Sequence, residues 1–122
     1  MEEPGGKKFE TLQKVKDMML YAYPALAQFP KSEKFSMVAR IKDIMDDMLE
    51  MCIEIENKIY RKNTLQNLDV ANKKLQTYLQ MAHFLQFLST HKYEVWSEKT
   101  VEIGKMIGGM LKAAKQPANH RR

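Results

Sequence analysis

The sequence predicts an all-α fold: an antiparallel four-helix bundle with up-down-up-down topology. Residues 31–103 contain neither glycine nor proline, whereas a β-protein needs turn residues about every 8–12 positions. Apolar residues recur at steps of three and four along four segments, which is typical of amphipathic helices. Only a few residues separate these segments, and short connections between long helices make neighbouring helices antiparallel.

The composition limits the class of protein. The chain has 122 residues, a size typical of one domain, with 44% hydrophobic and 29% charged residues. The mean hydropathy is -0.50, and no apolar run approaches the roughly 18 residues of a membrane span. The start MEEPGGKK lacks the apolar region of a secretory signal. The single cysteine cannot form an internal disulfide, which fits a reducing, cytoplasmic compartment.

The first two helices are bounded by proline and serine. In the first, Pro24 is expected to kink the helix or end its regular part, and Phe29-Pro30 closes it. For the second, Ser32 is the expected N-cap, with Phe35 in the first turn. The apolar stripe of the first helix is Leu12, Val15, Met19, Ala22 and Leu26. That of the second helix is Val38, Ile41, Met45, Met48, Cys52, Ile55 and Ile59.

The last two helices have N-caps of the preferred residue types, Asn63 or Thr64 and then Ser89 or Thr90. The third stripe is Leu68, Ala71, Leu75, Tyr78, Leu79, Ala82 and Leu85. The fourth is Tyr93, Trp96, Thr100, Ile103, Ile107 and Met110. We expect residues 1–8 to be a flexible N-terminus, residues 9–115 to form the bundle, and residues 116–122 to be a flexible basic tail.

The bundle has more apolar surface than its own core needs. A second stripe, placed away from the core by the helical period, predicts burial against another copy of the chain. Glycines close together in the fourth helix allow close helix–helix approach, although Gly108-Gly109 could instead end the helix. The interface candidates are Ile53, Val70, Met81, Phe84, Leu88, Gly104 and Gly108.

No pattern of catalytic residues is found. Residues 43–56 hold six acidic residues and no basic one, but the carboxylates lie opposite the core, and the Glu-x-x-His motif of di-iron bundles is missing. We interpret them as a solvated face. His83 is interpreted as a surface or interface residue, and Cys52 as a buried small hydrophobe. Without a phosphate-binding loop, zinc spacing or nucleophile elbow, the sequence predicts no metal, no cofactor and no enzyme.

The basic residues are the remaining signal. The chain has a net charge of +5 and a pI near 9.3, and many of its cations fall at the bundle end that holds the second connection and both termini. They predict weakly sequence-specific, salt-sensitive binding of nucleic acid. A solvated surface or a purely protein-binding module remains the alternative. The candidate residues are Lys58, Arg61, Lys62, Lys73, Lys74, Lys105, Lys112 and Lys115.

Several segments carry a resemblance to a known family. They are Tyr23-Pro24, the run from Phe29-Pro30-Lys31-Ser32 to Phe35, Arg40-Ile41, the stretch from Leu75 to Ala82, Tyr93-Glu94, and the run from Glu102 to Met110 that contains the three glycines. Over about residues 9–115, the chain resembles the accessory variability determinant protein (Avd) of diversity-generating retroelements. A bundle protein encoded by intervening sequences of ribosomal RNA genes is similar too, and ranks second.

The resemblance implies a pentameric, barrel-like ring in a bacterial or phage-infected cytoplasm. Such proteins associate with the element's reverse transcriptase and bind RNA or DNA. They support mutagenic copying of a template RNA that diversifies a target gene, and the polymerase does the chemistry. The third helix departs from the family pattern. Members often carry arginine or lysine where this chain has Gln76, Gln80, His83 and Gln86, and a charged residue where it has Phe84.

Overall fold

The computed structural model describes residues 6–57 and 63–115, with side chains described for residues 10–57 and 63–114. Within these ranges the chain forms four α-helices and one short 3-10 helix, η1, and no strand. This confirms the predicted all-α class. The elements in chain order are α1 (Gly6–Leu26), η1 (Lys31–Glu33), α2 (Met37–Glu56), α3 (Thr64–Phe84) and α4 (Thr90–Lys115).

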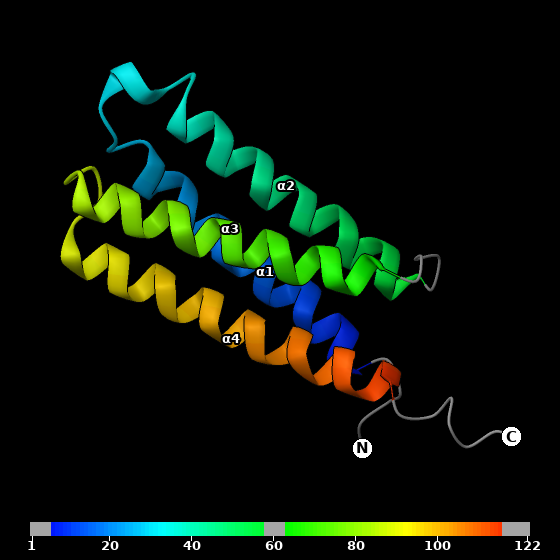
Figure 1. Ribbon diagram of the computed structural model, residues 1–122. Coiled ribbons are helices and arrows are strands. Elements are labelled where there is room, and N and C mark those ends of the chain that lie inside the picture. The colour runs from blue at the N-terminus through cyan, green and yellow to red at the C-terminus, as the bar shows by residue number, and fades with distance from the viewer. Residues whose placement is uncertain (1–5, 58–62, 116–122) are drawn as a thin grey trace, which may run out of the picture.

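The helices pack in a closed cycle, in which α1 contacts α2 and α4, and α3 contacts the same two helices. Figure 1 shows the α1–α2 and α3–α4 connections at one end of the bundle. At the other end, α1 and α3 begin and α2 and α4 end. The up-down-up-down order therefore matches the prediction. The predicted ring stays a prediction, because one chain is described.

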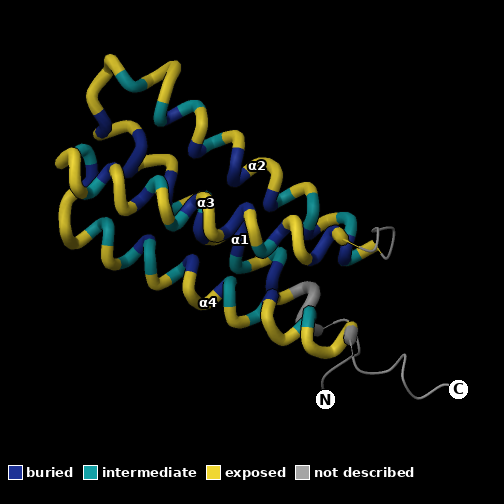
Figure 2. The backbone as a smooth tube through the Cα atoms, viewed as in Figure 1, coloured by how far each residue is buried: buried dark blue, intermediate teal, exposed yellow. Residues whose placement is uncertain are grey.

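The core lies along the inner faces of all four helices, as the dark segments of Figure 2 show. Most positions of the four predicted stripes are buried, and the single tryptophan, Trp96, is fully enclosed. In α1, Met18 rather than Met19 reaches the centre of the core. The other fully buried large side chains include Val15, Ile41, Met45, Met48, Leu68, Leu75, Leu79, Ile103 and Ile107.

The start of α2 differs from the prediction. Residues 31–33 tighten into η1, and the N-cap of α2 is Ser36 rather than Ser32. The Glu33 carboxylate explains the shift, because it accepts hydrogen bonds from Ser36 Oγ (2.7 Å) and from the Met37 backbone N–H (3.4 Å). Phe35 consequently lies before the helix, 87% exposed, instead of in its first turn.

The end of α3 gives a second correction. Gln86 adopts a left-handed backbone conformation with φ of 66°. The Phe87 and Gln86 N–H groups donate to the carbonyls of Ala82 and His83, at 2.8 and 3.0 Å, which is the Schellman arrangement. The helix therefore ends before Leu88. The outward position predicted for Leu88 is wrong, because the turn folds this side chain into the core, where it is 2% exposed.

The starts of α3 and α4 follow the prediction. Asn63 is the N-cap of α3, and its carbonyl accepts the Asn67 N–H at 2.9 Å. At α4, Ser89 Oγ accepts the Lys92 N–H at 3.2 Å. The helix then continues through Gly104, Gly108 and Gly109 to Lys115, so the glycines do not end it. Among the described residues, no helix combines the length and apolarity needed to cross a bilayer.

Candidate interaction surfaces

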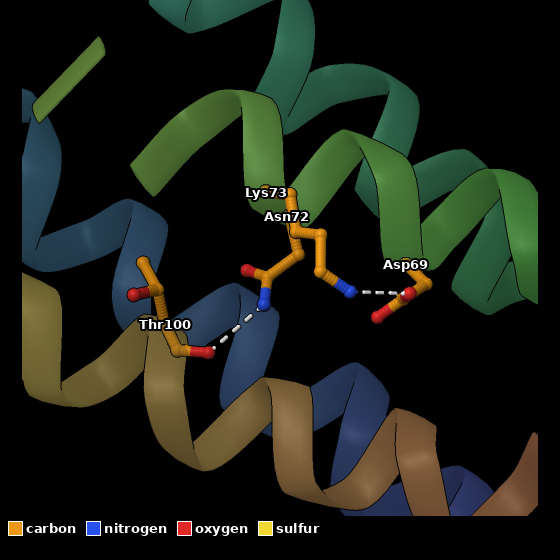
Figure 3. A network of polar contacts seen from close by, with 4 residues as sticks. All are labelled: Asp69, Asn72, Lys73 and Thr100. Carbon is orange, nitrogen blue, oxygen red and sulfur yellow. Dashed lines mark hydrogen bonds and ion pairs between the residues drawn. The ribbon is translucent and has the colours of Figure 1, made fainter. Parts of the chain in front are cut away.

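A buried polar contact joins α3 to α4 (Figure 3). Asn72 is 2% exposed, and its Nδ2 donates to the Thr100 carbonyl at 2.9 Å. The Thr100 hydroxyl accepts a hydrogen bond from Gln76 Nε2 at 3.1 Å and donates to the Ser97 carbonyl at 2.7 Å. Asn72 Oδ1 has no hydrogen-bond partner among the described residues. The sequence reading missed this contact, whose only signal is an asparagine beside Ala71 in the apolar stripe.

Gly104 belongs to the same contact. A Cβ at this position would lie 3.2 Å from Asn72 Nδ2, tighter than most real Cβ contacts. Gly104 therefore makes room for the Asn72 side chain of α3 within one chain, and its part in an interface between copies stays a prediction. Gly108 differs, since a Cβ there meets nothing within 4 Å. Of the two glycines predicted at an interface, only Gly108 faces open space.

The second apolar stripe is exposed on the described chain. It consists of Ile53 on α2 and of Val70, Met81 and Phe84 on α3. The exposed fraction is 85% for Phe84 and between 44% and 49% for the other three side chains. Met81 and Phe84 line a hollow of about 420 Å³ at the end of α3. Its lining is mostly apolar, as expected of a surface that a second chain could cover. The part of these residues in an interface between copies stays a prediction.

Half of the candidate basic residues have described side chains. Lys58, Arg61 and Lys62 lie outside the described residues, as does the side chain of Lys115. The other four are placed on α3 and α4. Lys73 pairs with Asp69, with Nζ and Oδ2 2.7 Å apart (Figure 3). Lys74, Lys105 and Lys112 are exposed.

The surroundings of Lys105 are acidic. It lines a hollow of about 660 Å³ along α4 together with three glutamates, Glu94, Glu98 and Glu102. Glu102 also pairs with Lys14 across the α1–α4 contact at 3.0 Å, and this hydrogen bond raises the pKa of Lys14. Glu102 lies one helical turn before Lys105, so its carboxylate weakens the attraction of Lys105 for a phosphate.

A set of cations that the candidate list omitted lies at the other end of the bundle. Lys42 Nζ sits 4.8 Å from the centroid of the Tyr23 ring, and Lys34 Nζ sits 5.4 Å from that of Phe35. Both are within the range of cation–π attraction. Lys34 and Phe35 belong to the run from Phe29 to Phe35 that carries the family resemblance, so the sequence signal for this set was present.

The remaining candidate groups are structural or solvated. No group of three or more metal-ligating side chains that could hold a metal ion is found within residues 10–57 and 63–114. Cys52 is buried, and burial raises the pKa of its thiol to about 12. The His83 ring stacks on Tyr93 with centroids 4.5 Å apart, and its Nε2 lies 3.1 Å from Thr90 Oγ1.

Comparison with known proteins agrees with this helical architecture. A family model described as bAvd-like matches residues 11–114, which covers all four helices almost completely. No similar chain was found among curated proteins or among solved structures. The resemblance inferred from the sequence is thus confirmed over nearly the whole bundle, and the chain belongs to the bAvd-like family.

Proposed function

We propose that this protein is a non-enzymatic accessory scaffold of a diversity-generating retroelement. It forms a homo-oligomer, a pentameric ring by the resemblance stated above, that brings the element's reverse transcriptase together with nucleic acid. The observation that carries the proposal is the bAvd-like match over residues 11–114. The net charge of +5 adds support, since the phosphate backbone of a template or its copy attracts a basic protein.

The exposed stripe of Ile53, Val70, Met81 and Phe84 supports the assembly. Light scattering after gel filtration measures it, and a species of 14.3 kDa at micromolar concentration would contradict the proposal. Phe84→Asp places a charge in the stripe and should shift the protein towards smaller species. Phe35→Asp is the matched control, because Phe35 is equally exposed but lies outside the stripe. If both variants assemble like the parent, the interface lies elsewhere.

Binding to nucleic acid is tested by a filter-binding titration with salt. The affinity should fall steeply between about 50 and 200 mM salt, because phosphate contacts release counterions. Affinity that is absent at low salt, or that does not depend on salt, would remove this part of the proposal.

Binding to the reverse transcriptase is tested by co-purification of the two proteins. The double variant Arg61→Glu and Lys62→Glu separates two roles of the basic residues. Loss of co-purification with unchanged RNA binding indicates that this basic end contacts the polymerase. Loss of RNA binding with unchanged co-purification indicates a nucleic-acid contact. A reverse transcriptase gene and paired repeats beside this gene would support the assignment to a retroelement, and their absence would count against it.

A further inference from the structure

One corner of the bundle combines exposed cations with exposed aromatic rings. It is formed by the end of α1, the α1–α2 connection and the first turns of α2, and is called the connection corner below. Its members are Tyr23, Lys31, Lys34, Phe35, Arg40 and Lys42. Lys31, Lys34 and Arg40 are exposed, and Lys42 is half-buried.

Two hollows open at the connection corner. The first, of about 340 Å³, has an apolar floor that includes Leu26 and Phe29, and Lys31, Lys34 and Lys42 stand around it. Its lining contains no acidic residue. The volume falls within the range of about 300–1,000 Å³ that is usual for ligand sites. An anionic group with an apolar or aromatic part matches such a hollow in charge and in shape.

The second hollow, of about 480 Å³, opens between α2 and α3 and shares no lining residue with the first; it is lined by Phe35, Arg40 and Tyr78 together with Glu33 and Asp43. Glu33 is engaged within the chain, since its carboxylate accepts hydrogen bonds from Ser36 and Met37. Asp43 is exposed at the edge of α2. The cations of the connection corner therefore outnumber its acids, and the excess is concentrated around the first hollow.

The aromatic rings decide which anion fits best. Phe35 is 87% exposed, which costs free energy unless a partner covers the ring. Duplex nucleic acid presents phosphates but keeps its base faces stacked inside. An acidic protein surface would pair with the lysines, but it meets Phe35 with a flat ring only where an aromatic side chain lies beside its carboxylates. A single strand supplies both groups at once, phosphates for the cations and open bases for stacking.

We propose that the connection corner is a binding site for single-stranded nucleic acid, with phosphates held by Lys31, Lys34 and Lys42 and a base stacked on Phe35. The proposal rests on the proposed function, in which the scaffold contacts a template RNA or its DNA copy. The inference specifies that the site binds single-stranded nucleic acid more tightly than duplex. The inference also places the contact at the end of the bundle that holds the α1–α2 connection, opposite to the end where α4 terminates (Figure 1).

The test measures binding of a fluorescein-labelled 20-nucleotide RNA, its DNA equivalent and the matching duplex by anisotropy at about 50 mM salt. In the full chain, Phe35→Ala should weaken single-strand binding about 5- to 150-fold, the usual range for loss of one base–aromatic stack, and leave duplex binding unchanged. Leu20→Ala is the control, because it removes an exposed apolar side chain of α1 that lies outside both the corner and the proposed subunit interface.

The charge arm uses the double variant Lys31→Ala and Lys34→Ala. The slope of log affinity against log salt should become shallower by about 1.4, because two single-strand phosphate contacts are lost. Lys16→Ala with Lys99→Ala is the control of equal charge, because neither lysine belongs to a candidate binding set, and its slope should stay that of the parent. Circular dichroism confirms that each variant keeps its helices.

The outcomes separate this inference from the proposed function. If the parent binds no oligonucleotide, the nucleic-acid role and the connection corner both fail. If the parent binds but Phe35→Ala and the Lys31/Lys34 variant bind as tightly as it does, only the corner is wrong. If the corner variants keep nucleic-acid binding and lose the reverse transcriptase, the corner contacts a protein, and the inference is overturned.

Discussion

The α1–α2 and α3–α4 connections lie at the same end of the bundle, but they treat their apolar residues differently. Each contributes one aromatic ring to a shared contact, in which the ring centroids of Phe29 and Phe87 lie 5.8 Å apart. Beyond it they diverge. The α3–α4 connection turns at once and buries Leu88, whereas the α1–α2 connection extends through η1 and leaves Phe35 in solvent. A short connection whose residues pack is a structural element. A longer connection that leaves rings and cations exposed can contact another molecule through these side chains.

The largest effect on stability is expected at Leu88. Leu88→Ala removes a buried side chain and leaves a cavity, which should lower the free energy of unfolding by about 2–5 kcal/mol. Urea denaturation followed by circular dichroism measures it. Leu85→Ala is the matched control in the same connection, and its loss should be much smaller because Leu85 is half-exposed. Equal losses for the two leucines would break the comparison.

A gain in stability is expected at Gln86. Its φ of 66° is strained for a residue with a Cβ, and Gln86→Gly should relieve this by about 1 kcal/mol. The control is Gln80→Gly in the interior of α3, where glycine should cost about 1 kcal/mol instead. Thermal and urea unfolding of both variants give the two signs. A loss at both positions would mean that the turn is not a left-handed helix end in solution.

A smaller loss is expected at Glu33, which holds the start of α2. Glu33→Ala removes the acceptor of the Ser36 and Met37 hydrogen bonds and should cost about 0.5–1 kcal/mol. Ser32→Ala is the informative control. Ser32 was the N-cap predicted from the sequence, and with the cap at Ser36 its loss should have no measurable effect. If Ser32→Ala lowered the free energy of unfolding more than Glu33→Ala does, Ser32 would be the N-cap and α2 would begin earlier than Met37.

The smallest effect is expected at Phe35. Because its side chain is exposed, Phe35→Ala should change the free energy of unfolding by less than about 0.5 kcal/mol. The same denaturation experiment applies. A loss above 1 kcal/mol would show that the ring packs against the chain, and the contrast between the two connections would disappear.

The helices themselves could be predicted from the sequence because burial follows the helical period. Ile41, Met45, Met48 and Cys52 occupy successive steps of three and four, and all four are buried. The ends were harder, since they depend on contacts that no period encodes. The sequence pattern placed the cap at Ser32, and the hydrogen bond from Ser36 to the Glu33 carboxylate places it at Ser36 instead. The left-handed turn at Gln86 could not be predicted, because the residue there is not the glycine that usually marks such a helix end.

The candidate surfaces were predictable only in part, and the reason is electrostatic context. Counting cations placed Lys105 among the binding residues, but three glutamates line the same hollow of α4. The spacing of Glu94, Glu98 and Glu102 at steps of four already indicated that face. By contrast, Tyr23 and Lys42 are far apart in sequence, so their contact required the fold. Asn72 was missed because a single polar residue hardly changes an apolar stripe.

The buried Cys52 makes the chain its own reporter of unfolding. With a thiol pKa of about 12, only about one side chain in ten thousand carries the reactive thiolate at pH 8, and the core also shields the sulfur. Alkylation of the native protein must therefore wait until the helices separate. With one cysteine per chain, the labelling rate in brief pulses of reagent measures how often a subunit opens. Assembly of subunits, or binding of a nucleic-acid strand, would lower the rate at which Cys52 is alkylated, and no added probe is needed to measure it.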